Sequence, residues 1–284
     1  MLNIFSENDF LSHTFPEPQY LGAKFIHRGW IAKFIPDNAD VTLDAFGGSQ
    51  SIAYMMKQLG KTTYTNDFLN FNNQIGKALV ENPSESLSQE DVSVLFSANK
   101  KPSEYNLMQT LFSDLFFTKD EATFIDSFRC NVDNLQNGYK RSLALTVMCR
   151  SMTRKVTMGH FAHTQALKYA ADPARIKRNR SLTRPLKDIF LDLLPEYNAA
   201  VFDNNKTNRS FNENILDLLP QIKNVDLVYF DPPYCNSTLT TSHFTICLKL
   251  LLNIGKTKNS LTEPKDMNQS GIADLTKTVK LSAI

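Results

Sequence analysis

The sequence predicts an α/β fold, in which a parallel sheet begins near the N-terminus, is interrupted by a mainly helical insertion, and resumes further along the chain. Two strand patterns support this prediction, at residues 41–46 and 225–230, because both are short, rich in β-branched and apolar residues, and followed by turn residues. The third observation is that apolar residues recur at helical spacing over residues 81–200, where glycine occurs only twice.

The N-terminal part contains one complete βαβ pattern. The strand at 41–46 leads into a glycine turn, a helical pattern over 52–59 stops at Gly60, and residues 61–67 form a second strand pattern. Strands joined through a helix are nearly always parallel neighbours in one sheet. We therefore expect residues 1–80 to form the first part of an α/β domain.

Composition places the chain among ordinary globular proteins. Hydrophobic residues make up 42% and charged residues 21% of the sequence, which excludes collagen-like and broadly disordered chains. The four cysteines lie far apart without a CxxC pair, which argues against a disulfide framework and fits a reducing cytoplasm. His160 and His163 have no third ligand nearby, so we expect no metal site. Without a signal-peptide pattern or an apolar stretch of about 18 residues, we expect a cytoplasmic protein without a membrane span.

Positive charge is concentrated in one part of the insertion. The formal net charge is only +2, so a nucleic-acid footprint has to be local. Six basic residues lie between positions 175 and 187 with polar residues among them, a density that favours contact with phosphates. The alternative is a solvated helix face. The six are Arg175, Lys177, Arg178, Arg180, Arg184 and Lys187.

A glycine turn links the first strand pattern to its helix. Glycines let a ligand approach the backbone closely, and the N-terminus of the following helix presents N–H groups. Asp67 ends the next strand about 20 residues later, the usual spacing for a carboxylate that binds ribose hydroxyls. The alternative is a structural turn with a surface aspartate. The GxGxxG pattern is absent, which disfavours a dinucleotide site. The turn consists of Asp44, Ala45, Phe46, Gly47, Gly48 and Ser49.

A second motif, Asp231-Pro232-Pro233-Tyr234, directly follows the later strand pattern. Ligands of open parallel sheets bind at the carboxyl ends of the strands. Two prolines fix φ and remove two backbone donors, so the loop presents carbonyls, a carboxylate and an aromatic ring. This set suits a planar base with an exocyclic amine. The alternative is a Pro-Pro strand terminator with a capping aspartate.

In combination, these motifs resemble the adenine-specific DNA methyltransferases of the Dam-like class. That family has a Y-L-G-x-K segment, an F-x-G-S-G cofactor loop, a target-recognition insertion and D-P-P-Y, in this order. The resemblance covers roughly residues 15–238 and keeps the family's order. The matching segments are Tyr20-Leu-Gly-Ala-Lys24, Phe46-Gly-Gly-Ser-Gln50, Asn66-Asp67 and Asp231-Pro-Pro-Tyr234.

The resemblance implies a methyltransferase with a Rossmann-like sheet and S-adenosylmethionine as cofactor. By this resemblance the turn at 46–49 holds the methionine part, Asp67 the ribose, and Asn214 lies near the adenine ring, although helix capping alone also explains Asn214. The resemblance also implies that the helical insertion reads DNA. The implied cofactor-binding residues are Tyr20, Lys24, Asp44, Phe46, Gly47, Gly48, Ser49, Asp67 and Asn214.

The implied reaction is direct methyl transfer to the exocyclic amine of adenine in duplex DNA, which requires the base to be flipped out. Asp231 and the Pro232 carbonyl would orient the amine, and Tyr234 would stack on the base, with Pro233 completing the catalytic set. A cognate restriction endonuclease is an implied partner. The alternatives are a non-catalytic remnant that binds DNA or S-adenosylmethionine, and an amino-methyltransferase acting on cytosine or RNA.

Two features depart from the family pattern. Gln50 replaces the second glycine of the cofactor loop, where close backbone approach matters. All aromatic residues lie at or before Phe244, and the sequence beyond it has lysine but no arginine and no clear periodicity.

The composition of the C-terminal part suggests a change of reading frame. Read one nucleotide over, with synonymous codons chosen freely, the codons from Ser242 onward can encode a continuation that resembles the family. We therefore predict an out-of-frame tail and an incomplete sheet, with a genuine divergent C-terminus as the alternative. The predicted segments are a catalytic part at 1–80, a DNA-reading helical insertion at 81–200, a second catalytic part at 201–241 and the tail at 242–284.

Overall fold

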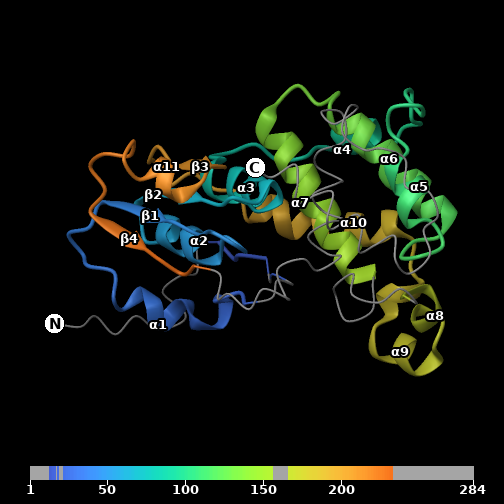
Figure 1. The fold of residues 1–284 in the computed structure, drawn as a ribbon, viewed down its shortest axis with the longest axis horizontal. Helices are drawn as coiled ribbons and strands as arrows, with labels where there is room; N and C mark the ends of the chain where they lie inside the picture. The colour runs from blue at the N-terminus through green and yellow to red at the C-terminus, as the bar shows by residue number, and fades with distance from the viewer. Residues whose placement is uncertain (1–12, 17, 19–21, 156–165, 233–284) are drawn as a thin grey trace.

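A four-stranded parallel sheet forms the base of the fold (Figure 1). The computed structural model of the protein describes residues 13–16, 18, 22–155 and 166–232. The strands lie in the order β3-β2-β1-β4, and every neighbouring pair is parallel, which confirms the predicted α/β class. The strands are β1 (Val41–Asp44), β2 (Thr62–Asn66), β3 (Arg209–Phe211) and β4 (Leu227–Tyr229).

Some residues that the sequence singles out lie outside the described ranges. For these the sequence-based expectations stay predictions. They are Tyr20, His160, His163, Pro233, Tyr234 and the whole segment 242–284.

The βαβ unit forms as the sequence predicts. Helix α2 (Ser51–Gln58) connects β1 to β2, and Gly60 has a φ of +74° just after the helix, the left-handed conformation that commonly ends helices. Helix α1 (Arg28–Ala32) packs against α2 through a small buried cluster that includes Ile31 and Met56. These two helices therefore cover one region of the sheet with apolar side chains.

Strand β4 is less buried than its apolar sequence predicts. All three of its residues are only half-buried. In the part of the chain that the structure describes, β4 pairs with β1 on one side and so lies at the edge of the sheet. The apolar run at 225–230 thus predicted the strand correctly but not its exposure, because burial depends on what covers the second edge and both faces.

Helices occupy the chain between β2 and β3. They are α3 (Asn70–Ile75), the π-helix η3 (Gly76–Glu81), α4 (Gln89–Leu95), α5 (Leu107–Phe112), α6 (Lys119–Val132), α7 (Gly138–Lys155), α8 (Ala166–Ala170), α9 (Pro173–Arg178), the 3₁₀ helix η5 (Arg180–Thr183) and α10 (Leu186–Ala199). A 3₁₀ turn, η2 (Phe25–His27), precedes α1, and α11 (Ile215–Leu218) follows β3. In Figure 1 the helices from α4 to α10 lie to the right of the sheet, with α8 and α9 projecting at the lower right.

Helix α7 is the centre of the helical part. It packs against α10 on one side and against α3 and η3, beside the sheet, on the other. One buried apolar cluster is continuous from α2 to these helices and contains Tyr54, Phe128 and Phe190. The insertion is therefore attached to the sheet by a shared core, which gives it a fixed position relative to the carboxyl ends of the strands.

Local sequence signals explain where several of these helices begin. Ser88 and Asp91 form a capping box at the start of α4, and Thr118 and Glu121 form another at the start of α6. Asp172 accepts a hydrogen bond from a backbone N–H of α9, whose first residue is proline. Each of these side chains satisfies backbone donors that a helix start otherwise leaves without partners.

Candidate functional site

Three aspartates meet at the carboxyl edge of the sheet. Asp44 is the last residue of β1, Asp67 follows β2, and Asp231 comes two residues after β4. Parallel strands end at a common edge, so the three carboxylates are brought together although they are far apart in sequence. The strand register also places Asp44 beside Thr65 and Tyr229. This edge is where open α/β sheets bind ligands.

Asp44 is almost completely buried, with 1% of its surface exposed. Its Oδ1 accepts a hydrogen bond of 3.3 Å from Phe46 N, at the start of the segment 46–50 that leads into α2 and is called the glycine loop below. Burial, together with the negative charges of Asp67 and Asp231, raises the pKa of Asp44 to about 7. A carboxyl group that titrates near neutral pH is typical of functional sites.

The glycine loop is fastened to the end of β2. Gly47 N donates to Asn66 O at 2.8 Å, and Gly48 N donates to Asp67 Oδ2 at 2.8 Å. Leu69 N donates to the other oxygen of the Asp67 carboxylate, also at 2.8 Å. Burial raises the pKa of Asp67, and these backbone hydrogen bonds oppose that shift. Asp67, the residue predicted to bind the ribose, therefore lies beside the predicted glycine loop and holds it in place.

Lys24 and Asp231 form an ion pair, with 2.6 Å between Lys24 Nζ and Asp231 Oδ2. Lys24 also donates to Gly22 O at 3.2 Å. Both side chains are partly buried, with exposed fractions of 27% and 18%. The N-terminal motif and the loop after β4, which the sequence treats as separate motifs, thus share one site.

Exposed aromatic rings border this edge, and the sequence reasoning missed them. Phe68 directly follows Asp67 and is 62% exposed, and Phe230 directly precedes Asp231 and is 53% exposed. The Phe230 ring centroid lies 6.1 Å from that of Phe46 in the glycine loop. Their signal in the sequence is their position next to the two strand-end aspartates. Exposed rings beside a polar site are suited to stacking on a planar ligand.

Asn214 has the structural role that capping predicts. It is the N-cap of α11, and its Oδ1 accepts a hydrogen bond from Leu216 N at 3.1 Å. Asn66, in contrast, exchanges two hydrogen bonds of 3.1 Å with the backbone of Glu213. Asn212 donates to Asp67 O at 2.7 Å. Asn66 and Asn212 therefore tie the segment between β3 and α11 to the end of β2, beside the candidate site.

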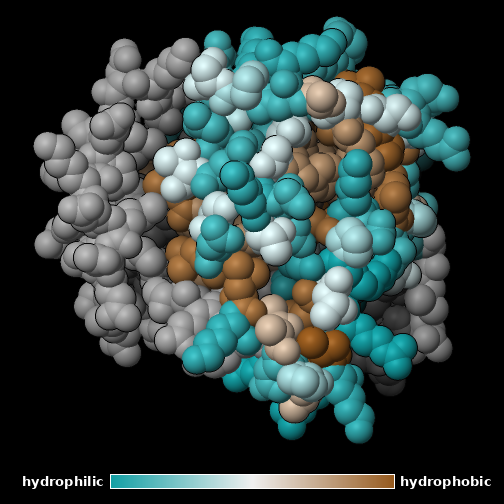
Figure 2. All heavy atoms as spheres, turned by 90° about the vertical axis from the view of Figure 1, so that its right-hand side faces the viewer, coloured by the Kyte–Doolittle hydropathy of each residue, from teal (hydrophilic) through white to brown (hydrophobic). Residues whose placement is uncertain are grey.

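The basic residues lie on α9, η5 and the start of α10, apart from the sheet (Figure 1). Arg175 is paired with Asp172 at 3.7 Å, and Arg184 with Asp192. Lys187 Nζ lies over the ring of Phe96 at 5.2 Å. The exposed members are Lys177, Arg178, Arg180 and Lys187. Figure 2 shows this end of the molecule, where hydrophilic side chains surround hydrophobic patches.

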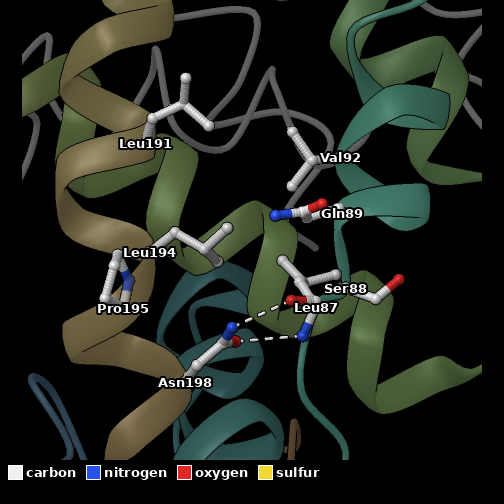
Figure 3. A pocket seen from close by; sticks show the side chains of 8 residues that line it. All are labelled: Leu87, Ser88, Gln89, Val92, Leu191, Leu194, Pro195 and Asn198. Carbon is white, nitrogen blue, oxygen red and sulfur yellow. Dashed lines mark hydrogen bonds between the residues drawn. The ribbon is translucent and has the colours of Figure 1, made fainter.

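A mostly apolar groove lies elsewhere, between the start of α4 and α10 (Figure 3). Leu191 and Leu194 line one side, and Leu87 and Val92 line the other. At one end Asn198 holds the backbone of Leu87 through two hydrogen bonds of 3.0 Å. None of the residues predicted for the site lines this groove.

The described residues contain no cluster of histidine, cysteine, aspartate and glutamate that could hold a metal ion. In that same part of the chain, no helix is both long and apolar enough to cross a membrane. The site is thus built from carboxylates, one ammonium group, glycine backbone and aromatic rings. These groups together fit a cationic ligand with a planar ring and hydroxyl groups.

Comparison with known proteins agrees with this geometry. The family model described as D12 class N6 adenine-specific DNA methyltransferase matches residues 20–272. The match includes both strand-end motifs and continues over residues 242–272, part of the predicted out-of-frame tail. The change of reading frame at residues 242–284 stays a prediction.

Two curated relatives are similar to the chain. The type II methyltransferase M2.HphI of Haemophilus parahaemolyticus is 33% identical over 226 residues, which cover 78% of this chain and 66% of that protein. The modification methylase StsI of Streptococcus sanguinis is 25% identical over 259 residues, which cover 86% of this chain and 38% of that protein. The chain thus spans under two thirds of the length of either relative. No solved structure gives a significant match.

Proposed function

Because the chain belongs to the D12 class N6 adenine-specific DNA methyltransferase family, we propose that it transfers a methyl group from S-adenosylmethionine to the exocyclic amine of adenine in DNA. The observation that carries this proposal is that three motifs meet at one edge of the sheet. They are the glycine loop, which Asp67 holds, and the N-terminal motif and the loop after β4, which the Lys24–Asp231 ion pair joins. Names such as type II methyltransferase and modification methylase, which belong to the two relatives, support the same reaction class.

The site fits S-adenosylmethionine by charge and by shape. The cofactor carries a sulfonium and an ammonium group, which suit the carboxylates of Asp44 and Asp67, and it supplies an electrophilic methyl group when bound. The backbone of Gly47 and Gly48 lies just before the start of α2, and we assign it to the methionine part of the cofactor. We assign the ribose hydroxyls to Asp67, whose carboxylate oxygens have acceptor capacity beyond their bonds to Gly48 N and Leu69 N. We assign Phe68 and the Asn214 region to the two sides of the adenine ring, with Tyr20, Lys24, Asp44, Phe46 and Ser49 completing the cofactor site.

The target amine would be held by the loop after β4. The Asp231 carboxylate and the Pro232 carbonyl accept hydrogen bonds from the exocyclic amine and direct its lone pair towards the methyl group. Pro233 keeps the loop stiff and Tyr234 stacks on the base; both lie outside the described residues. The reaction is then mainly a matter of positioning. A base inside a duplex cannot reach this edge, so the proposal includes base flipping.

The helical insertion at 81–200 is proposed to bind the DNA duplex. The exposed cations on α9 and η5 are available for phosphates, while Arg175 and Arg184 already have acidic neighbours. The names of the relatives further support a modification system. We place this system in the cytoplasm, with a cognate restriction endonuclease, as part of the proposal. The proposed domain boundaries are those expected from the sequence, with the second catalytic part at 201–241.

Parallel assays of binding and turnover test the proposal on the chain as it exists. Isothermal titration with S-adenosylmethionine measures cofactor binding, and transfer of a tritium-labelled methyl group to duplex DNA measures catalysis. We expect both. The unusual composition after Phe244 favours a second candidate, a binding protein without turnover, and binding without transfer would support it. Absence of both activities in a folded preparation would overturn the proposal.

A further inference from the structure

Gln50 stands at the one position of the cofactor loop where the sequence departs from the family pattern. Its backbone has φ +67° and ψ +7°, a left-handed conformation that side chains make unfavourable and that glycine adopts readily. Gln50 is also fully buried, with 0% of its surface exposed. The residue thus retains the backbone shape of a glycine and turns its side chain into the protein, away from the space where a ligand would lie.

The buried amide of Gln50 joins three elements. Thr65 Oγ1 of β2 donates to Gln50 Oε1 at 2.7 Å, and Gln50 Nε2 donates to Asn72 O of α3 at 3.2 Å. The orientation of the amide is determined by its partners, because the Asn72 carbonyl can only accept. Thr65 must therefore be the donor at the other end. Only an amide has both a donor and an acceptor at the required places.

The glycines around this amide show how tightly it is enclosed. A Cβ at Gly47 would lie 2.2 Å from Gln50 Nε2 and 2.5 Å from Thr65 Oγ1. A Cβ at Gly76 would lie 3.2 Å from Gln50 Oε1. The loop is therefore closed around a side chain that it supplies itself, and the amide fills the space directly behind Gly47.

The same strand end is attached to the loop through three successive residues. Thr65 holds Gln50, and two residues later Asp67 accepts the hydrogen bond from Gly48 N. Between them, Gly47 N donates to Asn66 O. Since all three attachments join one short loop to the same strand end, a shift of Gln50 would also move Gly48 relative to the Asp67 carboxylate.

We propose that Gln50 is a positioning residue for the cofactor: its internal amide fixes the glycine loop against Asp67 and so determines the affinity for S-adenosylmethionine. This inference rests on the proposed function of the site. Gln50 touches neither the target base nor the Lys24–Asp231 pair in this account. Its loss should therefore raise the Kd and the KM for the cofactor and leave kcat at saturating cofactor nearly unchanged.

Four single variants and one double variant test this role. Gln50→Met keeps the length and removes both hydrogen bonds, and Thr65→Val removes the partner hydroxyl; each should raise the Kd for S-adenosylmethionine about tenfold. Thr65→Ser keeps the hydroxyl and should restore wild-type affinity. Gln50→Gly relieves the left-handed backbone but lacks the amide, so weakened binding by this variant cannot come from backbone strain. The double variant Q50M/T65V should bind no more weakly than either single variant.

Ser151→Ala is a matched control, because Ser151 is buried in α7 and its hydroxyl donates to Val147 O of the same helix at 2.7 Å. It should leave the Kd for the cofactor unchanged, and its Tm provides the comparison for any general effect of stability on binding. An unchanged Kd in Gln50→Met and Gln50→Gly would overturn the positioning role while leaving the proposed function intact. The positioning role would also be overturned if the Kd of every variant, Ser151→Ala included, rose in proportion to its loss of Tm. Failure of the wild-type chain to bind the cofactor would instead contradict the proposed function.

Discussion

Lys24 Nζ lies 2.6 Å from Asp231 Oδ2, so a segment upstream of β1 is joined directly to the loop that follows β4. The pair brings an ammonium group to the carboxylate that we assign to the target amine, and it holds that carboxylate in one orientation. Partly exposed ion pairs contribute no more than about 1 kcal/mol to stability. The pair therefore matters mainly for the geometry of the reaction.

Substitution of Asp231 should separate catalysis from cofactor binding. We expect Asp231→Ala to lower the single-turnover rate of methyl transfer at least ~100-fold, because the amine loses its acceptor, with the Kd for S-adenosylmethionine little changed. Lys24→Met should also lower the rate, and Lys24→Arg should lower it less. Rapid-quench kinetics and calorimetry provide the two readouts. Near-normal turnover of Asp231→Ala would remove the catalytic assignment.

The exposed cations on α9 and η5 should contribute to DNA binding through phosphates. The double variant Arg178→Ala/Arg180→Ala should weaken binding of duplex DNA and lower the slope of log Kd against log salt by about 0.9 for each lost contact. Adding Arg184→Ala should have a smaller effect, because Arg184 is paired with Asp192. Fluorescence anisotropy at several salt concentrations measures the slope.

Two other lysines provide the control for this experiment. Lys206 and Lys223 are exposed and precede β3 and β4, so they lie at the amino edge of the sheet, opposite the site. Replacing both by alanine changes the net charge by the same amount and should leave the slope as it is. If the two double variants behave alike, the basic run is only a solvated surface.

Asp44 should make the stability of the protein depend on pH. Its pKa rises from an ordinary 3.8 to about 7 on folding, so the folded state binds more protons than the unfolded state between these values. The contribution of protonated Asp44 to the free energy of unfolding is therefore complete below about pH 4, and it is lost as the pH rises to about 7. Asp44→Asn should be more stable than the wild type at pH 8, by up to ~4 kcal/mol, and equal to it near pH 4.

Urea unfolding of both proteins across this pH range measures the difference. Asp217→Asn, a change at an exposed position on α11, should follow the wild-type curve. If the free energies of unfolding of Asp44→Asn and the wild type change with pH in parallel, folding does not shift the pKa of this carboxyl group.

The tail can be examined at the level of the gene. We expect the nucleotides encoding residues 242–284 to continue the family sequence when read one position over, because the aromatic residues and arginine that end near Phe244 would then return. Sequencing the codons around residues 234–245 from an independent isolate shows whether a base is gained or lost there. A coding strand that cannot produce such a continuation would establish this C-terminus as authentic.

Much of the site could be predicted from the sequence because it depends on short, local patterns. The strand ends at Asp67 and Asp231 follow from β-rich runs and turn residues, and parallel pairing then requires them to share an edge. The half-buried state of β4 could not be predicted, since burial depends on what covers the strand. The inward turn of Gln50 was also hidden, because it depends on Thr65 and Asn72, which no spacing rule connects to the loop.

The identity of the methylated nucleoside tests the central claim most directly. The wild-type chain is incubated with duplex DNA and S-adenosylmethionine that carries a trideuterated methyl group, and the nucleosides are then resolved by mass spectrometry. We predict that the label appears in N6-methyladenine and that Asp231→Ala abolishes it. Label in N4-methylcytosine instead, or label in N6-methyladenine that persists undiminished in Asp231→Ala, would contradict the account.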